Sequence, residues 1–147
     1  MRNTKTSIFL NSTLTVIFAA LSALHFSWAL GYSWGFRAAL PTTSSGQFLF
    51  EPQPIDSAIV GFGLLAFAVF YLLQLNGLAL KLNQKFNKII SWFIPSIFLL
   101  RAIGDFKYVG IFKPPMDTAF ASADFYIYSP ICLFIALFGY LIANTED

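Results

Sequence analysis

Four apolar stretches alternate with short polar segments along this chain. No charged residue occurs at 7–31 or at 58–80, and each stretch reaches the length of about 20 residues that a membrane-spanning helix needs. A third apolar run starts at Ile89 and a fourth runs from Phe125 to about Ala143. The pattern predicts an all-α fold, an integral membrane four-helix bundle. We place it in one transmembrane domain over residues 1–147, with spans at roughly 8–31, 58–80, 89–108 and 124–143.

The polar segments between the spans predict the topology. Residues 32–57 contain three prolines with glycine and polar residues, which favour an outer loop. The connection KLNQKFNK at 81–88 holds three lysines and no acid, a composition typical of the cytoplasmic side. Arg2 and Lys5 would lie on the same side as this connection, because two spans separate them from residues 81–88. We therefore expect the N and C termini to be cytoplasmic.

The basic start followed by an apolar stretch also resembles a signal peptide, with residues 27–29 as a cleavage site. We expect the segment to be retained as the first span.

Composition agrees with a lipid-facing chain. Of 147 residues, 57% are hydrophobic and 11% charged, whereas soluble domains carry about 25% charged residues. The nine basic residues are scattered, so no nucleic-acid partner is expected. One cysteine, Cys132, excludes an intramolecular disulfide. The single histidine, His25, has no Cys or His nearby in sequence, so we expect no metal site and no cofactor.

The third span carries the rare charges of the chain. From Ile89 to Leu100 there are 12 uncharged residues, which extend roughly 18 Å against a hydrocarbon core of about 30 Å. Either the helix continues to about residue 108, or it stops early. In both cases Arg101 would lie below the outer surface and need a partner. Asp105, at i+4, is the first candidate for that pairing.

A polar layer near the outer face follows from depth counting. Asp124 opens the fourth span and is a second candidate partner for Arg101, while Tyr128 lies one turn deeper. His25 falls at a similar depth in the first span. Lys107 and Lys113 are expected to be solvated. The predicted layer, ligand-binding or purely structural, consists of His25, Trp28, Arg101, Asp105, Asp124 and Tyr128.

Plainer interpretations stay open for the members of this layer. Arg101 with Asp105 could be a structural ion pair, His25 a packing residue, and Asp124 a helix cap.

Three motifs together resemble a known family: RAIGDFKYVGIFK at 101–113, FASADFYIYSP at 120–130, and HFSWALG at 25–31. The chain resembles a bacterial family of four-span integral membrane proteins known as domain of unknown function 3995. The resemblance implies a multi-pass protein of the bacterial cytoplasmic (inner) membrane. It carries no activity and no residue role to this chain.

The leading functional hypothesis is a non-enzymatic membrane protein. It would use the polar layer to bind a lipid-like or small amphipathic ligand, or a partner membrane subunit, with membrane lipid around it. One alternative is an enzyme on a lipid or isoprenoid-like substrate, with His25 and Asp124 exchanging protons. A third is a proton-coupled transporter, which would need a homo-oligomer.

Overall fold

The computed structural model describes residues 4–76 and 83–145. Within these residues the regular elements are helices, and Thr42 and Phe48 form an isolated β-bridge rather than a strand. The elements, in order, are α1 (Thr4–Ala29), the short 3-10 turn η1 (Arg37–Ala39), α2 (Pro54–Leu75), α3 (Gln84–Ile103), α4 (Ala119–Ala123), the π-helical turn η3 (Asp124–Tyr128) and α5 (Ser129–Ala143).

Four helical segments of the described chain are long and apolar enough to cross a membrane. They are Lys5–Ala29, Pro54–Leu75, Gln84–Ile103 and the joined α4, η3 and α5 at Ala119–Ala143. Helices satisfy their own backbone polar groups, which lipid cannot do, so this is the form that a spanning segment takes. The predicted all-α, four-helix membrane fold is confirmed.

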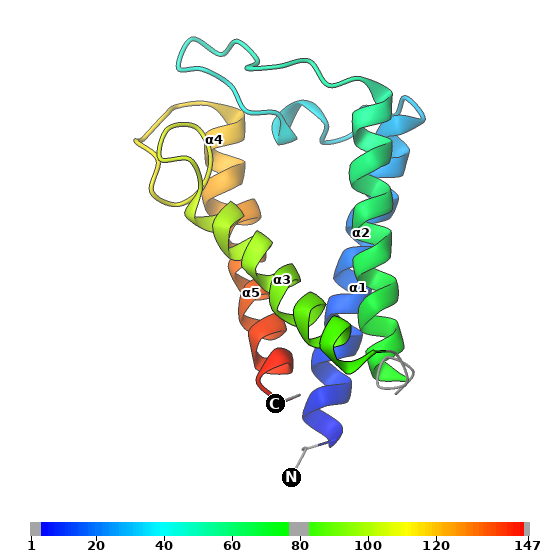
Figure 1. The fold of residues 1–147 in the computed structure, drawn as a ribbon. Helices are drawn as coiled ribbons and strands as arrows, with labels where there is room; N and C mark the ends of the chain where they lie inside the picture. The colour runs from blue at the N-terminus through cyan, green and yellow to red at the C-terminus, as the bar shows by residue number, and fades with distance from the viewer. Residues whose placement is uncertain (1–3, 77–82, 146–147) are drawn as a thin grey trace.

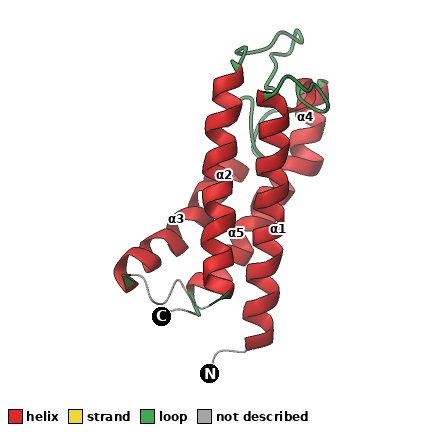
Figure 2. Cartoon of the chain, turned by 90° about the vertical axis from the view of Figure 1, so that its right-hand side faces the viewer, coloured by secondary structure: helices red, strands yellow, loops and turns green. Residues whose placement is uncertain are grey.

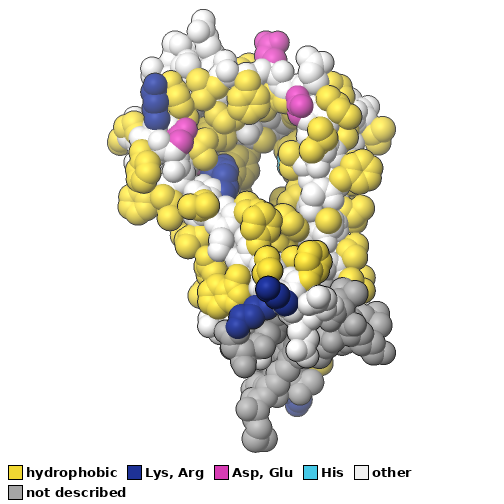
Figure 3. Space-filling model, in the orientation of Figure 1, with side chains coloured by type: hydrophobic (Ala, Val, Ile, Leu, Met, Phe, Trp, Pro, Cys, Tyr) yellow, Lys and Arg dark blue, Asp and Glu magenta, His cyan; other side chains and the backbone are white. Residues whose placement is uncertain are grey.

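The helices pack as two pairs. Helix α1 lies against α2, and α3 lies against α5 (Figure 1). The pairs approach each other at the end where α1 begins and α5 ends, here called the terminal end, and diverge toward the opposite end. That loop end holds residues 30–53 and 104–118, and Figure 2 shows both loops above the helices. On the face shown in Figure 3 the surface is open between the pairs and bordered mainly by hydrophobic side chains.

Aromatic side chains join the two pairs in the core. The ring of Phe18 on α1 is stacked on Tyr71 of α2, with ring centroids 5.7 Å apart, and is tilted against Phe98 of α3 at 5.2 Å. Aromatic pairs contribute about 0.5–1.5 kcal/mol beyond the area that they bury. Near the loop end, the Ser22 hydroxyl donates to the Gly61 carbonyl at 2.8 Å. The core therefore links α1 to both α2 and α3.

Close packing also holds the second pair. Pro95 lies inside α3 and Gly139 inside α5. A Cβ at position 139 would lie 2.7 Å from the Cβ of Pro95. Only glycine permits this approach of the two helices.

The predicted bounds of the spans need correction, most of all for the third. Helix α3 begins at Gln84 and ends at Ile103, so the predicted continuation to residue 108 is wrong. Asn83 caps the early start by accepting from the Lys85 amide at 3.0 Å. Gly104, with φ of 85°, ends the helix.

The other helices differ from the predicted spans by a few residues. Helix α2 starts at Pro54, where Gln53 and Asp56 form a capping box. The loop that precedes it consequently covers 30–53 rather than 32–57. The predicted end of the second span, residue 80, and Lys81 of the basic connection lie outside the described residues. Lys85 and Lys88 belong to α3 itself rather than to a connection.

Candidate functional site

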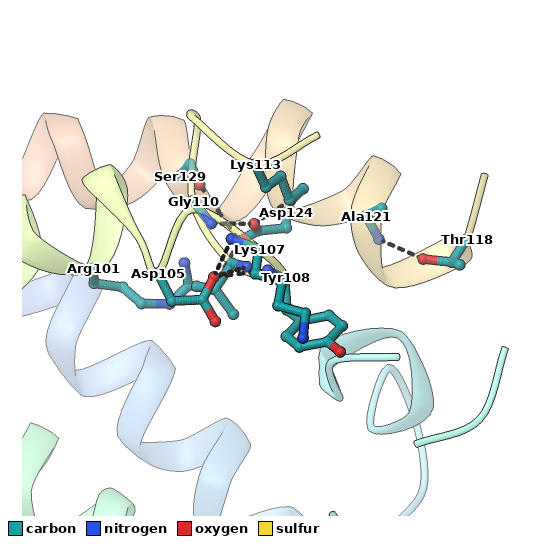
Figure 4. Close-up of polar contacts among 11 residues, drawn as sticks. Arg101, Asp105, Lys107, Tyr108, Gly110, Lys113, Thr118, Ala121, Asp124 and Ser129 are labelled. Atoms are coloured by element: carbon teal, nitrogen blue, oxygen red, sulfur yellow. Dashed lines mark hydrogen bonds and ion pairs between the residues drawn. The ribbon is translucent and has the colours of Figure 1, made fainter. Parts of the chain in front are cut away.

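Asp105 organises the loop that follows α3. Its Oδ1 accepts three backbone N–H groups, from Lys107 at 2.9 Å, Tyr108 at 2.7 Å and Val109 at 2.9 Å (Figure 4). Burial acts to raise the pKa of the Asp105 carboxyl, but these amide donors outweigh it and hold the pKa below its usual value. The carboxylate therefore fixes a loop conformation and does not meet Arg101.

Two glycines let this loop fold back onto the end of α3. Gly104 and Gly110 have φ of 85° and 94°, in the left-handed region. A Cβ on Gly104 would lie 1.8 Å from the Val109 carbonyl oxygen, and one on Gly110 would lie 2.4 Å from the Ile103 carbonyl oxygen. The Ile111 amide donates to the Ala102 carbonyl at 2.9 Å. The loop thus doubles back and presents residues 110–113 to the fourth span.

Asp124 contacts the residues that this loop brings to the fourth span, and it is the partner of Arg101. Its side chain is 0% exposed. Arg101 Nη2 donates to Oδ1 at 2.7 Å, and the Gly110 amide donates to Oδ2 at 2.7 Å. Lys113 Nζ forms an ion pair with Oδ2, and the Ser129 hydroxyl donates to Oδ1 at 3.4 Å. We call this set the Asp124 cluster: Arg101, Gly110, Lys113, Asp124 and Ser129 (Figure 4).

The charges of the Asp124 cluster do not balance. Two cations, Arg101 and Lys113, share one carboxylate, so the cluster carries an excess of one positive charge. The Lys113 side chain is 4% exposed and that of Arg101 is 33% exposed. Arg101 Nη1 is buried without a hydrogen-bond partner among the described residues. The cluster is therefore a buried site with cationic donors to spare.

The helical segment that carries Asp124 contains a π-helical turn. Residues Asp124–Tyr128 form a π-helical turn, closed by the Ser129 amide donating to the Asp124 carbonyl. Pro130 follows, and it has no N–H to give to the carbonyl four residues earlier. Such single π-turns within α-helices are frequent at functional sites. The turn brings the Asp124 carboxylate and the Ser129 hydroxyl to the same buried place.

A pocket adjoins the Asp124 cluster on its Lys113 side. Its volume is about 300 Å³, at the lower limit for small-molecule sites. Apolar and aromatic side chains form most of its wall, and Ser122 adds a hydroxyl. The lining residues are Lys113, Pro114, Pro115, Met116, Ala121, Ser122, Phe125 and Tyr126.

The loop, the cluster and the pocket fall within a segment that known proteins share. The family described as Protein of unknown function (DUF3995) matches residues 18–138. The chain belongs to the DUF3995 family. No curated protein and no solved structure matches it. The resemblance noted from the sequence motifs is thus confirmed, and this DUF3995 protein is an integral membrane protein of unknown activity.

The structure separates the members of the predicted polar layer. Arg101 and Asp124 are brought together, whereas Asp105 is exposed and bonded to its own loop. The predicted pairing of Arg101 with Asp105 is wrong, because the helix that would have set the i+4 spacing ends at Ile103. Tyr128 is half-buried and packs on Phe120, with ring centroids 6.3 Å apart.

His25 and Trp28 form a separate group near the end of α1. Their rings meet edge to face with centroids 4.7 Å apart. Trp28 Nε1 donates to the Trp34 carbonyl at 2.8 Å, which ties the loop to the helix. His25 Nδ1 is buried without a hydrogen-bond partner in the described chain, and His25 is not among the partners of Asp124. The proposed proton exchange between them has no hydrogen bond to support it.

Sequence reasoning missed two features of this DUF3995 protein. Lys113 was expected to be solvated, yet its side chain is buried in the Asp124 cluster, while Lys107 is exposed as expected. The second feature is a buried amide network at the terminal end. Gln74 Nε2 donates to Asn87 Oδ1 at 3.1 Å and to Ser91 Oγ at 3.4 Å, which joins α2 to α3. A polar residue inside an otherwise apolar span was the available signal.

Proposed function

We propose that this DUF3995 protein binds an amphipathic molecule with an anionic group at the loop end of its membrane domain. The observation that carries the proposal is the charge of the Asp124 cluster. Arg101 neutralises Asp124, and the ammonium group of Lys113 adds a second positive charge. No other carboxylate pairs with Lys113 among the described residues.

A buried, uncompensated charge is costly, and an anion offsets that cost. The Lys113 side chain is 4% exposed, so water provides little compensation. An ammonium group has three N–H donors, and Asp124 accepts from Lys113 with one oxygen. The remaining donors of Lys113 would hold the anionic group, with Arg101 Nη1 as a further unpartnered donor in the same cluster.

The pocket beside Lys113 indicates the nature of the rest of the ligand. Phe125 and Met116 offer apolar surface, while Ser122 and Tyr126 offer hydroxyl groups. A volume of about 300 Å³ holds a headgroup and the start of an alkyl chain rather than a whole lipid. The remainder of the chain would lie against the exposed apolar side chains of the span, in the bilayer.

We also propose that the terminal end faces the bacterial cytoplasm. The described residues at that end include Lys5, Lys85 and Lys88, all exposed, and cytoplasmic ends of membrane proteins collect basic residues. Cysteine substitutions at Ser45, in the loop end, and at Thr145, after α5, test this. A membrane-impermeant thiol reagent applied to intact cells would label the cysteine at position 45 and not the one at position 145. The reverse labelling would show the opposite topology.

An enzyme using His25 with Asp124 and an oligomeric proton-coupled transporter stay predictions from sequence, as does a partner subunit. The geometry favours binding, because the strongest polar contacts of Asp124 are with cations and an amide rather than with a titrating base.

The test is recovery of the ligand with the protein. Native mass spectrometry of the detergent-purified protein would detect a bound anionic amphiphile as an added mass, and extraction would identify it. We expect Lys113→Gln to lose this mass while remaining folded, since the Arg101–Asp124 pair is retained. Lys107→Gln, which removes an exposed lysine from the same loop, is the matched control. An identical bound species in wild type and Lys113→Gln would refute the proposal.

A further inference from the structure

Helix α3 presents a second basic and apolar groove, at the terminal end, away from the Asp124 cluster. The groove has a volume of about 540 Å³. Its lining residues recur at spacings of three and four, so they share one face of the helix. They are Lys85, Lys88, Ile89, Trp92, Phe93 and Ser96.

The groove matches one leaflet of a bilayer in length. Lys85 and Ser96 are 11 residues apart, which is roughly 16 Å along a helix. Half of a hydrocarbon core of about 30 Å is about 15 Å. A groove that starts at the helix end with Lys85 therefore reaches to about the middle of the membrane at Ser96.

The groove changes from basic to apolar along its length, in the same order as the headgroup and acyl chain of a phospholipid. The lysines lie at the end of α3 that would meet the membrane boundary, and none of the described residues that line the groove is acidic. Deeper, Ile89 and Phe93 are 57% and 55% exposed, so neither is covered by another helix. Figure 3 shows basic side chains next to hydrophobic surface near this end of the molecule.

The deep end of the groove is rigid. The Trp92 ring packs on Tyr140 of α5, with centroids 5.5 Å apart. The Ser96 hydroxyl donates to the Trp92 carbonyl at 2.7 Å and shares a hydrogen bond of 2.9 Å with the Tyr140 hydroxyl. Both hydroxyl groups are thereby satisfied, and they leave an apolar wall along which an acyl chain can lie.

We propose that this groove is a binding site for an anionic phospholipid of the surrounding bilayer. Lys85 and Lys88 contact the phosphate, and one acyl chain follows Ile89, Trp92 and Phe93 toward Ser96. The charge of the lysines selects anionic over zwitterionic lipid, because each basic residue near a membrane surface favours anionic lipid about fivefold. The site is independent of the ligand proposed for the Asp124 cluster, which lies at the opposite end of the bundle.

Trp92 reports on this site directly. The chain has three tryptophans, so Trp28→Phe with Trp34→Phe leaves Trp92 as the single tryptophan, which can be excited selectively over tyrosine. This variant is reconstituted in phosphatidylcholine vesicles that contain brominated phosphatidylglycerol or, at the same mole fraction, brominated phosphatidylcholine. Bromine in mid-chain quenches tryptophan on contact. If the double variant does not fold by circular dichroism, the difference between wild type and Trp92→Phe gives the same signal.

We expect brominated phosphatidylglycerol to quench Trp92 more strongly, and the preference to weaken in high salt. Lys85→Gln and Lys88→Gln would each reduce the relative affinity about fivefold. Lys107→Gln, an exposed lysine at the loop end, would leave it unchanged. Equal quenching by the two lipids, or a preference that survives loss of both terminal-end lysines, would overturn the proposal.

Discussion

Replacing Asp124 with Asn removes one negative charge from a site that holds two positive ones. The Asn side chain has nearly the same shape and keeps one oxygen for the Gly110 amide or the Ser129 hydroxyl. The guanidinium of Arg101 and the ammonium of Lys113 would then face each other without a carboxylate. The variant therefore tests the charge of the cluster rather than its packing.

The cost follows from the exposure of the two cations. Breaking a buried ion pair by removing one partner costs about 3–5 kcal/mol. Lys113 is 4% exposed and cannot regain water, whereas Arg101 is 33% exposed and regains part of its hydration. We therefore expect Asp124→Asn to lower the free energy of unfolding by about 3 kcal/mol, the lower end of that range.

Unfolding by SDS in mixed micelles, followed by far-UV circular dichroism, measures this difference. Asp117→Asn, which neutralises an exposed carboxylate of the same loop, is the control and should change stability little. Asp105→Asn should cost less than about 1 kcal/mol, because its carboxylate is exposed. If Asp124→Asn stayed within about 0.5 kcal/mol of wild type, or if Asp105→Asn cost as much, the account of Arg101 pairing with Asp124 would be refuted.

Three further outcomes follow from the same structure. Gly110→Ala should destabilise the protein by at least about 2 kcal/mol, because its φ is 94° and a Cβ there would clash with backbone atoms. Gly63→Ala, which has open space around it, should leave the stability unchanged in the same SDS titration. Folding lowers the pKa of Asp105, so the carboxylate stabilises the fold above the unfolded pKa of about 4, and this contribution is lost as the pH falls through the folded pKa. A pH series of the free energy of unfolding checks this, and Asp105→Asn should flatten its decline toward low pH. Ser22→Ala, which removes the hydrogen bond to Gly61, should cost about 0.6 kcal/mol in thermal unfolding, and a loss above 2 kcal/mol would contradict the value typical of such bonds in membranes.

The fold could be predicted because lipid leaves few alternatives. A run of more than 20 residues without charge must satisfy its backbone internally in lipid, so the helical form of the longer runs follows from their lengths. The third run, with 12 uncharged residues from Ile89 to Leu100, reaches the length of a span only when its flanking residues are included. The end of α3 could not be predicted in this way. It depends on Gly104, whose positive φ is compatible with a helix end but is required only by the loop that folds against it.

The sequence predicted two members of the Asp124 cluster, Arg101 and Asp124, but placed Asp105 before Asp124 as the partner of Arg101. Depth counting identified Arg101 and Asp124 as members of one layer, and the structure joins them. The i+4 spacing would bring Asp105 to Arg101 only on a continuous helix, and α3 ends at Ile103. Lys113 was misplaced for the same reason: its burial results from the backward turn of residues 104–113, a tertiary feature that local spacing does not encode.

A binding titration measures whether the excess positive charge of the Asp124 cluster holds an anionic amphiphile. Dodecyl phosphate and uncharged dodecanol are titrated against the protein in detergent by isothermal calorimetry, with Lys113→Gln and Lys107→Gln in parallel. We expect wild type and Lys107→Gln to bind the phosphate at least about tenfold more tightly than the alcohol, in line with charge-assisted hydrogen bonds of about 1.5–3 kcal/mol. Lys113→Gln should bind both alike. A folded Lys113→Gln protein that kept the full preference for the phosphate would show that Lys113 does not hold the anionic group.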